Sequence, residues 1–232
     1  MNFLPRLGIA ALLSLMAQPV LAASAEYELD PVHTRVMVAV EHAGFSKALG
    51  TVSGSTGRLR FDPDDWTTAQ LQVGIPLQRL DFGDGKWNKA VLASGLMDAE
   101  RFPTAQFVST RIEPIDPAHA SVHGNLTLHG VTREVTLKVV LNALKRHPLP
   151  PFRRTAGFSA TTVVSRADFG IDAWKSVIGD AVEIRLEVEA TRTRGGDQDE
   201  AGDIPAEVTP ADVTPTQDPS APPDPAQEPA TP

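Results

Sequence analysis

The stretch Gly124–Val140, GNLTLHGVTREVTLKVV, decides the fold class of this chain. Apolar residues occupy alternate positions on both sides of the central glycine, at Leu126, Leu128, Val135, Leu137 and Val139. A period of two is the period of a β-strand with one apolar face. Gly130 supplies the backbone freedom of a tight turn, so the stretch predicts an antiparallel hairpin. A single hairpin cannot bury its apolar face, and the chain must therefore contain further strands.

The same alternation recurs along the chain. It predicts strands over residues 34–42, 50–61, 69–77, 104–113, 121–128, 131–144, 155–166 and 181–192. Residues 86–99 have apolar residues near helical spacing and predict one short helix between the third and fourth strands. Glycines within 50–61 predict a bend there, and Pro114 and Pro117 predict an end to the fourth strand. This pattern favours an all-β antiparallel domain, and periodicity alone leaves both a sandwich and a closed barrel open.

Both ends of the chain differ from the strand-rich part. Residues 1–22 combine Arg6, the apolar run Leu7–Ala17 and small residues around Ala22, as a secretory signal does, and cleavage after Ala22 or Ala25 fits. The apolar run is shorter than the ~20 residues that a spanning helix needs. Together with the absence of cysteine, this predicts a bacterial periplasmic or secreted protein with no transmembrane span in the mature chain.

The C-terminal segment 195–232 has nine prolines, nine acidic residues and no lysine or arginine. Such a segment cannot bury enough apolar surface to order itself, so it predicts a disordered acidic tail. Residues 23–194 then form one domain with twenty basic and twenty acidic side chains, a net charge of zero. A domain with this balance of charge has no net positive potential to attract nucleic-acid phosphates, so we expect no nucleic-acid partner.

Catalytic and metal-binding patterns are absent from the sequence. The lack of cysteine excludes a thiol nucleophile and cysteine-ligated metals. His33 and His42 are nine residues apart, which would place them on opposite faces of a straight strand. No ligand spacing, nucleophile elbow or nucleotide-binding glycine motif occurs. We therefore expect no catalytic residue, no metal and no cofactor.

Four fragments in order resemble the YceI family of lipocalin-like periplasmic proteins. The first begins Tyr27-x-Leu29-Asp30-Pro31-x-His33-Thr34, and the others are Arg101–Thr110, Gly124–Arg133 and Arg166–Ile184. The resemblance extends from Tyr27 to about Ala190 and excludes the acidic tail. The helical segment departs from the family, because Trp87–Leu92 lacks the usual Arg-Asp-x-His-Leu run.

The resemblance implies an eight-stranded antiparallel lipocalin-like barrel. Its hydrophobic interior would bind a polyisoprenoid or another long amphiphilic lipid, and some family members are homodimers. The in-phase strand residues predicted to form the wall are Val36, Val38, Leu71, Val73, Phe107, Leu126, Leu137, Phe158, Ile184 and Leu186. The residues predicted to close an end are Trp87, Leu96, Met97, Phe169 and Trp174, and Arg166 is predicted to meet an anionic lipid head.

Three functions are compatible with the sequence. A carrier, storage or stress-protection protein requires an apolar cavity and no turnover. A lipid-modifying enzyme would require a polar cluster deep in the same barrel. An interaction module would have a solidly packed barrel and would act through its acidic tail. The sequence favours the lipid-binding protein because of the family resemblance.

Overall fold

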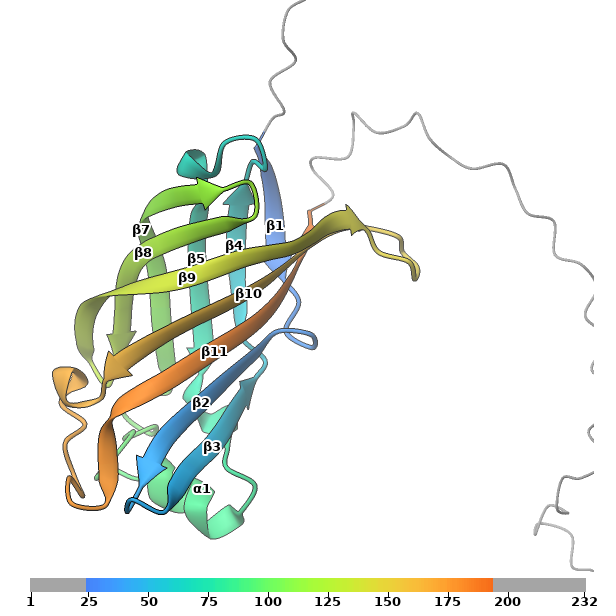
Figure 1. The fold of residues 1–232 in the computed structure, drawn as a ribbon. Coiled ribbons are helices and arrows are strands. Elements are labelled where there is room, and N and C mark those ends of the chain that lie inside the picture. The colour runs from blue at the N-terminus through green and yellow to red at the C-terminus, as the bar shows by residue number, and fades with distance from the viewer. Residues whose placement is uncertain (1–23, 194–232) are drawn as a thin grey trace, which may run out of the picture. The chain divides into compact units, whose positions relative to one another are not determined.

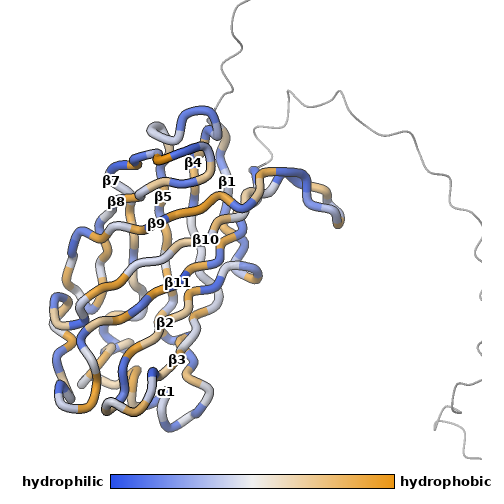
Figure 2. The backbone as a smooth tube through the Cα atoms, in the orientation of Figure 1, coloured by the Kyte–Doolittle hydropathy of each residue, from blue (hydrophilic) through white to orange (hydrophobic). Residues whose placement is uncertain are grey.

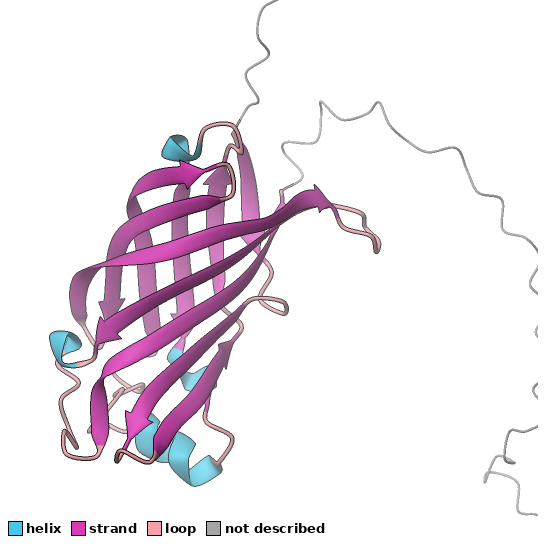
Figure 3. Cartoon of the chain, viewed as in Figure 1, coloured by secondary structure: helices cyan, strands magenta, loops and turns pink. Residues whose placement is uncertain are grey.

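The structure, a computed structural model, describes residues 24–193, and the predicted signal and tail lie outside this range. Strands dominate it (Figure 3). They are β1 (Ala25–Leu29), β2 (Arg35–His42), β3 (Ser46–Ser53), β4 (Thr56–Phe61), β5 (Gln70–Pro76), β6 (Leu80–Asp81), β7 (Thr104–Asp116), β8 (His119–Leu128), β9 (Val131–Arg146), β10 (Arg154–Ser165) and β11 (Ile178–Arg192). The helical elements are α1 (Gly85–Leu92) and the 3-10 turns η1 (Trp66–Thr68), η2 (Leu77–Arg79) and η3 (Ala167–Phe169).

Eight of these strands close an antiparallel barrel in the order β1-β4-β5-β7-β8-β9-β10-β11, with β11 returning to β1 (Figure 1). The long strand β11 has two partners along one edge, since Ala190 faces Leu29 on β1 while Leu186 faces Val36 on β2. Strands β3 and β6 continue the sheet beyond β2. The predicted all-β, eight-stranded barrel with a short helix is confirmed.

The hairpin that decided the fold class is β8–β9. Leu128 pairs with Val131, and the two turn residues His129 and Gly130 have φ values of 51° and 76°. Two successive positive φ angles are the signature of the two-residue turn whose twist matches that of the strands. A Cβ atom on Gly130 would lie 2.6 Å from Cε1 of Phe102, so this position requires glycine for both its conformation and its space.

We expect Gly130→Ala to lower the free energy of unfolding by about 2–3 kcal/mol, since backbone strain and a contact with the Phe102 ring add together. The matched control is Gly83→Ala, because Gly83 has φ +81° but nothing within 4 Å of an added Cβ. That variant should lose only about 1 kcal/mol. Urea unfolding measures both, and equal losses would mean that Phe102 gives way to the methyl group.

Two local predictions were wrong, and one strand was not predicted. Residues 50–61 form two strands, because the chain turns at Gly54 (φ +77°) and passes from partner β2 to partner β1. Strand β7 continues to Asp116 through Pro114, since the register shifts there and the missing N–H is tolerated at a bulge. Strand β1 was not predicted, because its alternation covers only five residues.

The described residues include no helix that is long and apolar enough to cross a membrane. Their largest apolar cluster lies inside the barrel, where the buried faces of β1, β4, β7, β8 and β10 meet. Along the strands hydrophobic and hydrophilic residues alternate (Figure 2), so one face of each strand is turned inward. This inward face forms the wall of the candidate site.

Candidate functional site

The barrel encloses a cavity of about 540 Å³. This volume lies within the range of about 300–1,000 Å³ that is typical of ligand pockets. Its lining is almost entirely aliphatic and aromatic, and the polar residues among the described lining are Thr34, Glu41, His42, Ser55, Thr162 and Arg166. A site of this composition suits an apolar ligand with at most a small polar group.

The interior of the barrel is not filled by its own side chains. Val38, Val73, Leu137 and Ile184 all line the cavity, yet each is only partly buried. Side chains on the inner face of a packed barrel would be fully buried, because protein interiors are close-packed. The open space therefore belongs to the cavity itself and offers apolar surface to a ligand.

One end of the cavity, the closed end, is sealed by the aromatic residues Phe61, Trp66 and Phe158. Phe61 meets Trp66 edge-to-face with centroids 5.1 Å apart, and Phe158 with centroids 5.5 Å apart. All three rings are buried. Phe158 was predicted from the sequence to line the cavity, whereas Phe61 and Trp66 were not. The signal available was the aromatic residue at each end of the Asp62–Asp65 turn, which fixes both rings at the same barrel rim.

The opposite end, the mouth, is formed by the β2–β3 turn, α1 and the loop 170–177 before β11 (Figure 1). The exposed lining residues all lie there: Glu41, Trp87, Ala90 and Trp174. Ala43 N–H donates to the carbonyl of Val177 at 2.6 Å, and the rings of His42 and Trp87 lie 5.4 Å apart. The three segments thus meet around one opening.

Thirteen of the fourteen residues predicted to bind the ligand line this cavity, and their contact with a ligand stays a prediction. They are Val36, Val38, Leu71, Val73, Trp87, Phe107, Leu126, Leu137, Phe158, Arg166, Trp174, Ile184 and Leu186. Leu96 and Met97 also line it.

Phe169 is the exception and does not line the cavity. Its ring is buried in the apolar cluster, with 1% exposure. The η3 turn ends at Gly170 (φ 73°), and the carbonyl of Phe169 lies 3.2 Å from Nδ1 of His129 in the β8–β9 turn. Phe169 therefore anchors η3 beneath that turn and closes no end of the cavity, because its ring is buried among the side chains of the apolar cluster.

Arg166 lies in the cavity wall, but its guanidinium donates hydrogen bonds to backbone carbonyls of the protein. Nε donates to the carbonyl of Gly179 at 2.9 Å and Nη2 to that of Ile178 at 2.9 Å. Nη1 donates to the carbonyls of Ile171 and Ala173, both at 2.8 Å. Four of its five N–H donors thus hold the loop 170–177 and the start of β11. The side chain organises the mouth, which is a different role from the predicted contact with an anionic head.

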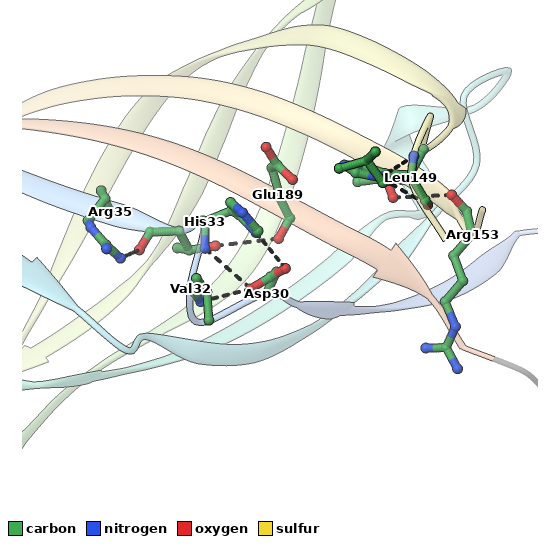
Figure 4. A network of polar contacts seen from close by, with 10 residues as sticks. Asp30, Val32, His33, Arg35, Leu149, Arg153 and Glu189 are labelled. Atoms are coloured by element: carbon green, nitrogen blue, oxygen red, sulfur yellow. Dashed lines mark hydrogen bonds and ion pairs between the residues drawn. The ribbon is translucent and has the colours of Figure 1, made fainter. Parts of the chain in front are cut away.

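A polar cluster outside the cavity joins the β1–β2 turn to β11 (Figure 4). Side-chain oxygens or nitrogens of Asp30, His33 and Glu189 lie within 4.8 Å of one another, close enough to share a metal ion. The Asp30 carboxylate already accepts hydrogen bonds from the backbone N–H groups of Val32 and His33 and lies 2.8 Å from His33 Nδ1. Both oxygens of the Asp30 carboxylate are therefore already engaged in hydrogen bonds within the β1–β2 turn. These bonds hold the turn that connects β1 to β2.

The hydrogen bond to Asp30 raises the pKa of His33 above its ordinary value. Burial of Asp30 opposes ionisation, but its hydrogen bonds to His33 and Val32 outweigh burial and lower the pKa of Asp30. The protonated histidine is thus favoured by the fold. Its small stabilising contribution is present below the ordinary pKa of about 6.5 and is lost as the pH rises through the raised value.

We expect Asp30→Asn to return the pKa of His33 towards its ordinary value, as measured by an NMR titration of the His33 ring. Asp116→Asn is the control, because Asp116 pairs with His119 in the β7–β8 turn and not with His33. An unchanged His33 pKa in Asp30→Asn would show that the pair does not form in solution.

Comparisons with known proteins agree with this architecture. The family model of the YceI-like domain matches residues 27–190. A UPF0312 protein of Pseudomonas putida (strain W619) is 30% identical over 175 residues, which cover 75% of this chain and 90% of that protein.

Among solved structures, BcnA of Burkholderia cenocepacia superposes with a TM-score of 0.64 at 24% identity, covering 70% of this chain and 99% of that one. A polyisoprenoid binding domain from Saccharophagus degradans, implicated in plant cell wall breakdown, superposes with a TM-score of 0.55 at 15% identity. It covers 72% of this chain and 98% of that domain. At these identities the likeness of both solved structures is one of fold.

Proposed function

Because the chain belongs to the YceI-like family, we propose that it binds a long, mainly apolar lipid of the polyisoprenoid type inside its barrel and carries or stores it without chemical change. The observation that supports this most is the unfilled apolar cavity of about 540 Å³. The fold shared with a polyisoprenoid binding domain supports the same class of ligand. The signal-like residues 1–22 support action in the bacterial periplasm or outside the cell.

Apolar burial alone supplies the affinity in this proposal. Each methylene group that leaves water for the cavity contributes about 0.8 kcal/mol, so ten of them contribute about 8 kcal/mol before entropic costs. The head group would lie at the mouth, where Glu41 and His42 offer hydrogen-bonding groups. Since the guanidinium of Arg166 is occupied by carbonyls, the cavity favours an uncharged head over a phosphate.

The two competing functions receive less support. A packed interior, which the interaction module needs, is at odds with the cavity. An enzyme needs titratable groups at the reacting atoms. Among the described residues that line the cavity, the titratable ones are Glu41 and His42 at the mouth and the hydrogen-bonded Arg166. In the deep part of the cavity the polar side-chain groups of the described lining are hydroxyls and the indole N–H of Trp66, and these support binding.

Organic extraction of the purified chain followed by mass spectrometry tests the proposal. We expect one isoprenoid or quinone-like lipid per chain, or stoichiometric uptake after a polyprenol is added. Absence of a bound lipid together with no uptake would contradict the proposal.

A cavity-filling variant separates ligand binding from folding. Ala160 lines the cavity, whereas its neighbour Thr161 is exposed on the outer face of β10. We expect Ala160→Phe to reduce lipid load at least about tenfold with little loss of stability, because the new ring takes the space of the ligand. Thr161→Phe adds the same ring outside and should keep the full load. Equal loads in both variants would place the ligand outside the barrel.

A further inference from the structure

The mouth carries large apolar side chains that the fold leaves in solvent. Phe45, at the tip of the β2–β3 turn, is 91% exposed, and Trp174, in the loop 170–177, is 68% exposed. Trp87 on α1 is 43% exposed beside them. Side chains of this size usually contribute to stability by burial. Here Phe45 contributes almost none and Trp174 only a part, so both leave apolar surface free to contact a partner.

Both tips lie on turns with unusual backbone geometry. Ala43 and Gly44 have φ values of 53° and 74°, and Trp174 itself has φ 58°. Positive φ at a residue other than glycine is uncommon and for a bulky side chain is strained. The two turns are also tied together by the hydrogen bond from Ala43 to Val177. Phe45 and Trp174 are therefore presented by turns that are linked to each other at the mouth.

Charged residues of both signs lie next to these tips, among them Lys86 and Lys89 on α1 and Glu41 on β2. Lys47 lies 2.5 Å from Glu183, and Lys175 lies 3.0 Å from Asp172. The carboxylate of Asp84 caps α1. The mouth thus presents apolar tips among charges of both signs, which is the pattern that suits the zwitterionic head-group layer of a bilayer. A strongly anionic partner would need an excess of positive charge.

The cavity opens at this end, and this suggests what the exposed tips do. A lipid that leaves the cavity through water would expose its apolar chain, at a free-energy cost that grows with every methylene group. A mouth seated in the head-group layer removes that exposure, because the chain passes from one apolar phase to another. Exposed aromatic tips around an apolar opening fulfil this requirement.

We propose that the mouth docks onto a phospholipid bilayer through Phe45 and Trp174, so that the lipid enters and leaves the cavity without crossing water. This inference rests on the proposed lipid-binding function, and it adds the partner surface and the route of exchange.

Flotation with uncharged vesicles of phosphatidylcholine and phosphatidylethanolamine tests the docking. The full chain should float with the vesicles, and Phe45→Ser combined with Trp174→Ser should reduce the bound fraction about 10–100-fold. The matched control is Leu149→Ser with Phe152→Ser, which removes two residues that are 64% and 52% exposed in the β9–β10 turn. That turn adjoins Thr155, which pairs with Thr191, so it lies towards the closed end. All variants keep the same termini, so a difference in the vesicle-bound fraction between them comes from the substituted residues at the mouth.

Three results would overturn the proposal. One is equal flotation of the mouth variant and the wild type. Another is binding that needs anionic lipid and disappears at high salt, because it would be electrostatic. The third is a wild-type dimer that the mouth substitutions convert to a monomer in sedimentation, because the tips would then cover a second copy. Lipid load, measured separately by extraction, distinguishes failure of docking from failure of lipid binding. Flotation without any lipid load would contradict the proposed function and the exchange route, and would leave the docking surface itself standing.

Discussion

Replacement of Arg166 by methionine is expected to lower the free energy of unfolding by about 3–5 kcal/mol, which corresponds to a fall in melting temperature of roughly 10 °C for a domain of this size. Arg166 is 6% exposed, and its guanidinium donates to four backbone carbonyls between Ile171 and Gly179. Methionine preserves much of the apolar stem but leaves these carbonyls without their donors. Unsatisfied buried carbonyls carry a desolvation cost that the stem cannot offset.

The loss should be concentrated at the mouth. Hydrogen exchange is expected to accelerate in the loop 170–177, while the amides of β8 and β9 keep their protection until global unfolding. Arg166→Lys should recover only part of the stability, since one ammonium group cannot reproduce the planar fork. Arg185→Ala is the control: this side chain is exposed and pairs with Glu187, so its loss should cost less than about 1 kcal/mol. Similar losses in Arg166→Met and Arg185→Ala would contradict the role assigned to Arg166.

The sequence was sufficient to identify most strands because their alternation is local. The β8–β9 hairpin needs only neighbouring residues to define its faces and its turn. Closure of the barrel is different, since it depends on Leu29 meeting Ala190 across most of the chain. The five residues of β1 show too short an alternation to predict that pairing. No local pattern predicts that one edge of the long strand β11 pairs with two different strands.

The inner face of the barrel was also predictable, but its emptiness was not. Parity alone places Val38, Leu137 and Ile184 on one side of their strands. Whether such side chains fill the interior depends on their summed volume around eight strands and on barrel width, which periodicity does not contain. Phe169 shows the same limit, because its burial in the apolar cluster depends on the packing of η3 against β10 and against β9, which is more distant in the sequence.

The role of Arg166 could not be predicted for a further physical reason. Its partners are backbone carbonyls, and a carbonyl is present at every residue, so sequence gives no sign of where four of them converge. A conspicuous arginine next to a loop therefore suggested a ligand contact. The structure instead gives four of its five donors a partner in the loop 170–177 or at the start of β11.

Val38→Asp is expected to abolish lipid binding, because it places a carboxylate on the apolar wall between the Cα partners Ile184 and Gly50. A charged group in contact with the lipid chain would be desolvated without a partner, at a cost of several kcal/mol. The lipid load should fall at least about 100-fold. Stability should fall less, by about 1–3 kcal/mol, since water can enter an emptied cavity and solvate the charge.

Met37 provides the matched control, because it neighbours Val38 on β2, faces outward and is 39% exposed. Met37→Asp should keep the lipid load and change stability by no more than about 0.5 kcal/mol. Val38→Asn separates charge from polarity, and it should retain more lipid than Val38→Asp at neutral pH. Burial next to a lipid raises a carboxyl pKa, so lipid binding by Val38→Asp should recover partly as the pH falls and the group becomes neutral. A full lipid load in Val38→Asp at neutral pH would show that the lipid does not reach this wall, and the barrel interior would then not be its binding site.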